Sequence, residues 1–102
     1  MTDSDGVLFF WGVDCQSCDE VRPFVEDLAR EHPHIQFDYV EIFRNETNAT
    51  RYYEANRALG VAPRGIPEVI AGGSAFFGGE EIREGLPGVV QAVEAGDGTR
   101  GG

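Results

Sequence analysis

A short apolar run followed closely by a helical pattern is the feature that most limits the folds open to this chain. Residues 7–11, Val-Leu-Phe-Phe-Trp, form a continuous apolar stretch between two glycines, which is typical of a strand buried on both faces. Apolar residues then recur at helical spacing from Val21 to Ala29, until Pro33 stops the pattern. This spacing predicts an amphipathic helix. A buried strand that leads into such a helix indicates a layered α/β domain.

Two further regions of the chain predict β-structure. Residues 35–43 mix apolar and polar positions and are rich in β-branched and aromatic side chains, as strands are. Residues 67–71 and 75–77 are largely apolar and flank a turn at 72–74 that contains two glycines. This second pattern predicts a β-hairpin.

Two more helices complete the predicted order of elements. Thr47 or Asn48 can cap the second helix, which carries Tyr52 and ends at Gly60. The last helix can bury one apolar face, made of Ile82, Leu86, Val89, Val90 and Val93. The resulting order, β-α-β-α-β-β-α, favours a three-layer α/β fold in which a central mixed sheet is flanked by helices.

The length of the chain fits one domain. Its 102 residues, 41% of them hydrophobic, can form one packed core but not two. We therefore expect a single domain over 1–102, with an ordered core from about 7 to 95 and a loose tail over 96–102. No apolar run approaches the roughly 18 residues that cross a bilayer, and the acidic start lacks the basic region of a secretory signal. These observations predict a cytoplasmic protein without membrane contact, and we expect a monomer.

Acidic residues outnumber basic residues by 18 to 8, and the net charge is −10. All eight basic residues are arginine. A nucleic-acid partner is not expected, because phosphate binding needs clustered cations. Two interpretations of the acidic surface stay open: a self-repelling surface that keeps the protein soluble, or adaptation to concentrated salt, which screens such repulsion.

Cys15 and Cys18 are the chain's two cysteines and lie between the predicted first strand and first helix. The start of a helix presents unpaired backbone N–H groups and the positive end of its dipole, which stabilise a thiolate. The thiolate is the form that attacks disulfides, so Cys15 is the expected nucleophile. Cys18, a turn further into the helix and more buried, can attack the mixed disulfide and release the product as a thiol. The pattern thus indicates thiol–disulfide exchange.

Other interpretations of this pair stay open. The pair can be structural and inert, or half of a zinc site, although structural zinc normally has four ligands. The two histidines, His32 and His34, are expected as solvent-facing turn residues at the far end of the helix, roughly 20 Å away. Two other functions are a redox-regulated binding module without turnover and a metal chaperone.

From about Val7 to Ala95 the chain resembles the thioredoxin and glutaredoxin superfamily. Residues 10–18, Phe-Trp-Gly-Val-Asp-Cys-Gln-Ser-Cys, are similar to thioredoxin's strand-to-CxxC segment, and Pro23 matches the proline that bends the helix after it. Residues 64–67, Arg-Gly-Ile-Pro, resemble the superfamily's cis-proline loop, which lies opposite the CxxC. The resemblance implies a cis Ile66–Pro67 bond and a thioredoxin-like fold.

The resemblance also implies substrate contacts. In the superfamily the cis-proline loop aligns an extended substrate chain, so Gly65, Ile66 and Pro67 are expected at the substrate, as are Gln16 and Ser17 between the cysteines. Residues 78–82, Gly-Gly-Glu-Glu-Ile, are similar to the segment in which glutaredoxins hold glutathione, which implies contacts from Gly79 and Glu80. The alternative is a hairpin exit whose acidic residues favour the helix start. Arg64 can contact a substrate acid or nearby carboxylates.

Three departures from thioredoxin mean that its redox potential does not transfer to this chain. Gln16-Ser17 replaces Gly-Pro, Asp14 replaces a tryptophan, and Phe9 stands where thioredoxin has a buried aspartate. The negative charges of Asp14, Asp19 and Glu20 around the pair oppose the thiolate, which favours a reductant over an oxidase.

The expected activity is therefore reduction of disulfides in proteins or small molecules, with no metal or prosthetic group. The redox-active Cys15–Cys18 disulfide takes the place of a cofactor, and glutathione or another small thiol is a possible co-substrate. No G-x-G-x-x-G follows a strand, so electrons must come from a separate reductase or thiol pool.

Overall fold

The computed structural model describes residues 6–101, with side chains described as far as Ala95. The elements follow the predicted order. Their bounds are β1 Val7–Trp11, α1 Gln16–Glu31, β2 Phe37–Glu41, α2 Glu46–Leu59, β3 Glu68–Ala71, β4 Ser74–Phe77 and α3 Gly78–Gly101. The loose tail expected at 96–102 falls beyond the described side chains and stays a prediction.

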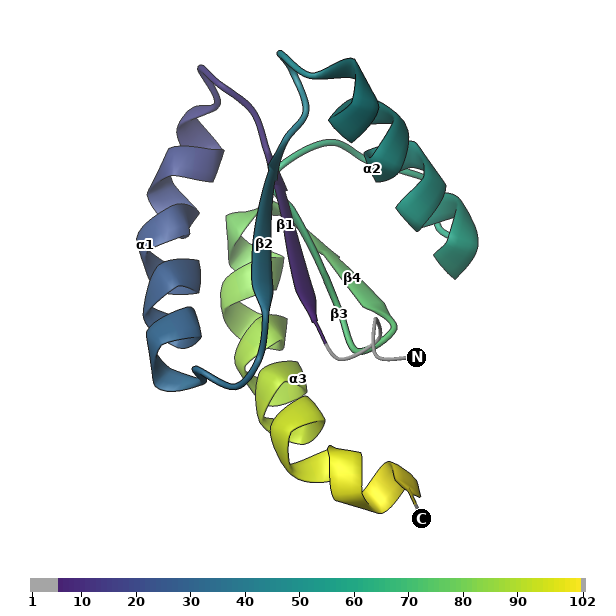
Figure 1. The fold of residues 1–102 in the computed structure, drawn as a ribbon. Coiled ribbons are helices and arrows are strands. Elements are labelled where there is room, and N and C mark those ends of the chain that lie inside the picture. Colours follow the sequence, from purple (N-terminus) through teal and green to yellow (C-terminus); the bar gives the residue numbers. More distant parts are fainter. Residues whose placement is uncertain (1–5, 102) are drawn as a thin grey trace.

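The four strands form one sheet in the order β2-β1-β3-β4. β1 runs parallel to β2, whereas the β1–β3 and β3–β4 pairs are antiparallel. Helices α1 and α3 lie on one face of this sheet and α2 on the other (Figure 1). The predicted three-layer α/β fold with a central mixed sheet is therefore confirmed.

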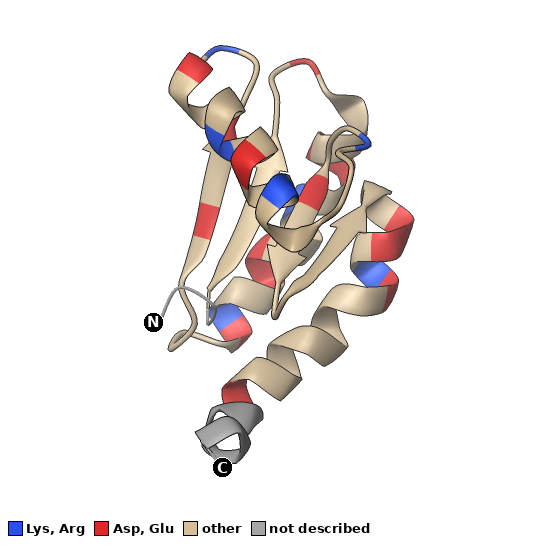
Figure 2. Cartoon of the chain, turned by 90° about the vertical axis from the view of Figure 1, so that its right-hand side faces the viewer, with Lys and Arg blue, Asp and Glu red and all other residues tan. Residues whose placement is uncertain are grey.

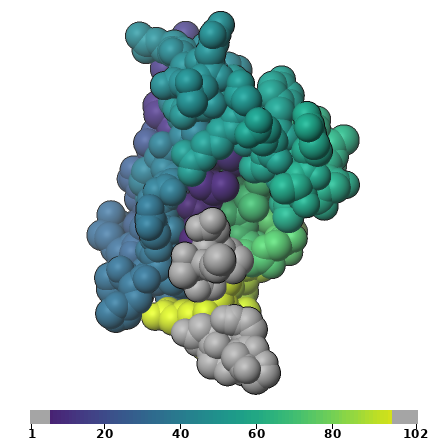
Figure 3. Space-filling view, turned by 45° about the vertical axis from the view of Figure 1, so that its right-hand side comes forward, coloured from purple at the N-terminus to yellow at the C-terminus, as the bar shows by residue number. Residues whose placement is uncertain are grey.

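Charged residues lie mostly on the helices and loops, and the strands are largely uncharged (Figure 2). In the space-filling view, atoms of α2 and of the segment after it form the upper and right-hand part of the molecule, with little of β1 visible beside them (Figure 3). Coverage by helices on both faces explains why the strands can be so apolar.

Among the described residues, no helix has the length and apolar character to cross a membrane. Nor do three or more His, Cys, Asp or Glu side chains in that part of the chain gather as a metal site.

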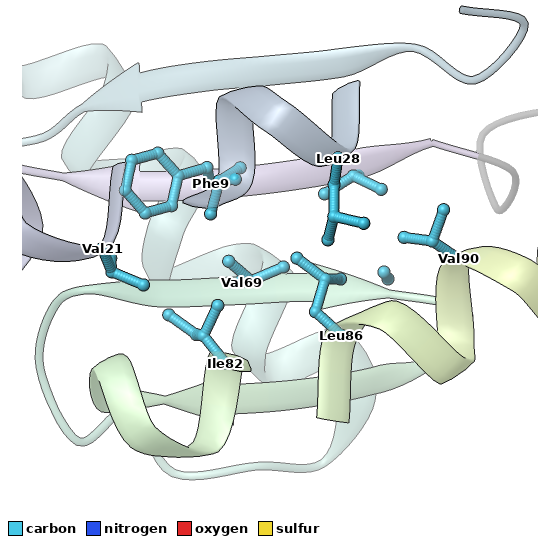
Figure 4. Close-up of a cluster of buried hydrophobic side chains, with 10 residues drawn as sticks. Phe9, Val21, Leu28, Val69, Ile82, Leu86 and Val90 are labelled. Atoms are coloured by element: carbon cyan, nitrogen blue, oxygen red, sulfur yellow. The ribbon is translucent and has the colours of Figure 1, made fainter. Parts of the chain in front are cut away.

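Two apolar clusters hold the layers together. The larger cluster lies between the sheet and the α1–α3 layer (Figure 4) and contains Val7, Phe9, Val21, Val25, Leu28, Val69, Ala71, Ile82, Leu86 and Val90. Phe10, Val40 and Tyr52 form the smaller cluster beneath α2. Because successive strand residues point to opposite faces, Phe9 enters the first cluster and Phe10 the second. The prediction of a strand buried on both faces is confirmed.

The start of α2 differs from the prediction. Asn45, rather than Thr47 or Asn48, caps the helix, because its Oδ1 accepts a hydrogen bond from the Asn48 N–H at 3.0 Å. The predicted end is confirmed: Gly60 adopts a left-handed conformation with φ +73°. Glycine takes this conformation without the Cβ clash of other residues.

One expectation about the histidines after α1 also needs correction. His34 is exposed as expected, but His32 is partly buried and its Nδ1 pairs with the Glu94 carboxylate of α3. His32, the C-cap of α1, therefore joins this helix to α3 instead of facing solvent.

Candidate active site

The cysteine pair lies at the start of α1. Cys15 is the N-cap residue, Cys18 is in the first turn, and the two form a disulfide with Cα atoms 5.2 Å apart. The Cys18 N–H donates to Cys15 Sγ at 3.1 Å. Cys18 is 1% exposed, whereas Cys15 is partly exposed. Cys15 therefore presents the sulfur that a second thiol can reach, and the greater burial predicted for Cys18 is confirmed.

Exposed acidic side chains flank the disulfide. Asp14, directly before Cys15, has φ +61°, a left-handed conformation that Asp tolerates better than most residues. Asp19 and Glu20 are exposed in the first turns of α1. The Gln16 side-chain amide donates to Glu20 at 3.2 Å. Gln16 and Ser17 are both exposed, so the residues between the cysteines face solvent.

Glu41, at the end of β2, is a further acidic group at this site. Its carboxylate accepts hydrogen bonds from the backbone N–H groups of Val13 at 3.0 Å, Phe43 at 3.0 Å and Arg44 at 2.8 Å. Partial desolvation raises its pKa, but the three N–H donors and the Arg44 charge outweigh it and lower the pKa below the ordinary value. An ionised Glu41 thus joins the loop before Cys15 to the loop after β2. Its position at the carboxyl end of a parallel strand beside β1 was the available signal, but the sequence analysis missed it.

The predicted cis-proline loop is present. The Ile66–Pro67 bond is cis, and the loop is held from α2 by Tyr52. The Tyr52 hydroxyl donates to the Gly65 carbonyl at 3.1 Å and accepts from the Gly65 N–H at 2.9 Å. The Ile66 side chain reaches the segment before Cys15, since a Cβ on Gly12 would lie 2.9 Å from its Cδ1. The structure therefore brings the loop against the segment that leads to Cys15.

An open cavity of about 380 Å³ adjoins this loop. Its lining residues come from the loop and the start of α3: Arg64, Gly65, Ile66, Pro67, Phe77, Gly78 and Glu81. Arg64 pairs with Glu81 at 3.2 Å, and its guanidinium lies 4.5 Å from the centre of the Phe77 ring. Glu81 also accepts from the Phe77 N–H at 2.8 Å, and this bond, with Arg64, lowers the pKa of Glu81. Arg64 thus contacts a local carboxylate, one of its two expected roles.

Gly79, Glu80 and Glu81, in the segment that resembles glutaredoxins, have different surroundings. Gly79 faces α1, because a Cβ on it would lie 3.8 Å from Val21 Cβ. Glu80 is exposed and does not line the cavity, whereas Glu81 does. The acidic residue that bonds the Phe77 N–H and Arg64 at the start of α3 is therefore Glu81, whereas the expected contact of Glu80 with glutathione stays a prediction.

Gly12 makes a close approach that we expect to be sensitive to substitution. A Cβ at this position would lie 2.5 Å from Phe43 Cδ2. Gly12→Ala should therefore displace the Phe43 and Ile66 side chains and lower the free energy of unfolding by about 1–3 kcal/mol, as overpacking does. Thermal melting measures this effect.

Gly88→Ala is the matched control for that substitution. A Cβ on Gly88 meets nothing within 4 Å, so alanine in this helix should leave stability unchanged or raise it by about 0.5–1 kcal/mol. A Gly12→Ala protein as stable as the Gly88→Ala protein would contradict the close approach. The double variant Gly12→Ala/Phe43→Ala should recover part of the loss.

Comparison with known proteins identifies the class of fold. No protein-family model and no curated sequence matches the chain. Among solved structures it is similar to Fasciola hepatica thioredoxin (25% identity, 88% of this chain and 85% of that chain, TM-score 0.60). It is also similar to a mutated buckwheat glutaredoxin (16% identity, 92% and 81%, TM-score 0.62) and to the buckwheat glutaredoxin–glutathione complex (17% identity, 85% and 74%, TM-score 0.57). The chain has a thioredoxin-like fold, and its CxxC disulfide lies at the start of the first helix.

Proposed function

We propose that this protein is a thiol–disulfide oxidoreductase that reduces disulfides in other proteins. The observation that carries this proposal is the Cys15–Cys18 disulfide at the start of α1, with its outer sulfur on Cys15 and the Ile66–Pro67 loop held against the segment before it. The structure corresponds to the oxidised enzyme. A separate reductase or thiol pool supplies the two electrons that regenerate the dithiol.

The proposed cycle has two exchange steps. The Cys15 thiolate attacks one sulfur of the substrate disulfide; the substrate S–S bond breaks, a mixed disulfide forms, and one substrate thiolate leaves and takes up a proton. The Cys18 thiolate then attacks Cys15 Sγ, which releases the second substrate thiol and forms the Cys15–Cys18 bond. The substrate disulfide gains two electrons and two protons, and the enzyme dithiol loses them.

Two features favour protein disulfides over glutathione disulfide as substrates. Phe43 is 60% exposed and lies over Gly12 beside Ile66, which offers an apolar contact for a substrate chain. At the start of α3, the segment that resembles the glutathione-holding part of glutaredoxins, Glu81 accepts the Phe77 N–H and pairs with Arg64. Glu81 thus already occupies the N–H group and the guanidinium that could receive a glutathione carboxylate, so glutathione is the second candidate substrate.

A turnover assay tests the proposal. The wild-type protein should accelerate the reduction of insulin by dithiothreitol, and should act on glutathione disulfide more slowly. No acceleration of either reaction would favour the binding module without turnover. Stoichiometric zinc or copper binding by the reduced protein, without acceleration, would favour the metal chaperone.

We predict that the enzyme is a reductant. Asp14, Asp19, Glu20 and Glu41 place negative charge near the Cys15 thiolate and so favour the disulfide form. Equilibration with glutathione should give a potential nearer to about −270 mV than to about −120 mV, the values of thioredoxin and of a strong oxidant. Replacing Asp14, Asp19 and Glu20 by their amides should raise the potential. A wild-type value near −120 mV would contradict this direction.

A further inference from the structure

A buried carboxyl group lies directly after the cis-proline. Glu68 is 0% exposed, and on β3 it pairs with Phe10 of β1 and Phe77 of β4. Its side chain contacts Asn56 of α2, so it lies on the face of the sheet opposite α1 and Cys18 (Figure 1). Neither exchange step uses it. A carboxyl group without solvent needs a partner or a proton.

Asn56, also 0% exposed, is the partner of Glu68. Its side-chain amide nitrogen donates to the Tyr52 carbonyl at 2.8 Å and to Glu68 Oε1 at 2.9 Å. The Tyr52 carbonyl can only accept, so it defines which end of the amide is nitrogen. Asn56 Oδ1 and Glu68 Oε2 are both buried and have no hydrogen-bond partner in the described part of the chain.

Each of these two oxygens lacks a hydrogen-bond donor, and a single added proton can serve both. A proton on Glu68 Oε2 would remove the buried charge and would supply that donor to Asn56 Oδ1, as in a reciprocal acid–amide pair. The charged or titratable groups that face Glu68 are Arg64, in the preceding loop, and Tyr52 on α2, while its strand neighbours Phe10 and Phe77 carry no charge. Arg64 is shared with Glu81, so it compensates only part of a charge on Glu68.

Desolvation acts in the same direction. Burial raises the pKa of Glu68 above the ordinary value, although the Asn56 hydrogen bond and the Arg64 charge oppose the shift. The hydrogen-bond pattern and the burial therefore both favour the neutral acid.

Helix α2 holds the cis-proline loop on both sides of Ile66–Pro67. Tyr52 bonds Gly65 on one side, and Asn56, one turn later in α2, bonds Glu68 on the other. We propose that Glu68 is a neutral acid and a positioning residue, which with Asn56 aligns the Ile66–Pro67 loop for substrate, and that its ionisation weakens substrate binding. The positioning role rests on the proposed function, whereas the protonation of Glu68 does not.

Two measurements test the protonation without any need for activity. The ¹³C resonance of the Glu68 carboxyl, assigned by its loss in Glu68→Gln, should titrate above the ordinary value of a glutamic acid. The native state then binds a proton that the unfolded state has lost, so wild-type stability should fall as pH rises from about 4.5 through the native pKa. Glu68→Gln, which can form the same reciprocal pair without a charge, should lose this fall. Titration at or below the ordinary value, or equal pH profiles of melting temperature, would overturn the inference.

Kinetics test the positioning role. Above the native pKa of Glu68, the wild-type KM for insulin should rise about tenfold. The value of kcat should depend on the exchange steps at Cys15 and not on Glu68. In Glu68→Gln the KM should stay low across the same pH range. Glu54→Gln, the same change at an exposed position of α2, should keep the wild-type profile. A KM profile shared by wild type and Glu68→Gln would overturn the positioning role, whereas absence of turnover in every protein would refute the proposed function and leave the titration result standing.

Discussion

Replacing Cys15 with serine should reduce disulfide reduction to the rate of the uncatalysed exchange. Serine cannot form the thiolate that attacks, and Cys18 is 1% exposed, so it cannot substitute as the first nucleophile. The insulin assay with dithiothreitol measures the loss. Thr50→Ala, an exposed change on α2 away from the cysteines, is the control and should retain wild-type activity.

The corresponding change at the inner cysteine should have a different result. Cys18→Ser keeps the attacking thiolate but removes the resolving thiol, so it should accumulate a mixed disulfide with its substrate through Cys15. Mass spectrometry detects this adduct, and the captured protein identifies a substrate. Equal capture by Cys15→Ser and Cys18→Ser would contradict the assignment of the two roles.

The largest expected loss of stability comes from Phe9→Ala. Phe9 is 0% exposed in the cluster between the sheet and the α1–α3 layer, and its truncation leaves a cavity among packed neighbours. Phe→Ala changes in cores cost about 3–5 kcal/mol, which in a domain of this size corresponds to a fall in melting temperature of roughly 15–30 °C.

Phe43→Ala is the matched control for Phe9→Ala. The same atoms are removed from a side chain that is 60% exposed, so the loss should stay below about 1 kcal/mol. Thermal and urea unfolding measure both variants. Equal losses would show that Phe9 does not pack as described.

The sequence predicted the order of elements because its local signals are clear. The apolar run at 7–11 indicates a buried strand, and the helical spacing after Val21 indicates an amphipathic helix. Gly60 marks the end of α2. The start of α2 was predicted wrongly because Asn45, Thr47 and Asn48 are all good capping residues. Which of them caps depends on where the chain leaves β2, and local preference does not specify that.

The candidate site was predictable where one short segment carries the signal. The CxxC pair and the Arg-Gly-Ile-Pro segment are such cases. Glu41, Asn56 and Glu68 were missed because their roles come from pairs of elements that only the fold brings together. The contacts of Glu81 are a smaller case, since two adjacent acids are equivalent in sequence until the helix defines their directions.

The cysteines and the loop opposite them are anchored in different layers of the molecule. Cys15 and Cys18 lie at the start of α1, on one side of the sheet, whereas Tyr52 and Asn56 hold the loop from α2, on the other. If the protein is the proposed oxidoreductase, we expect substitutions in α2 to alter which substrates it accepts and substitutions around α1 to alter its redox potential. Under that proposal, substrate selectivity and redox potential would be set by different layers of this small domain.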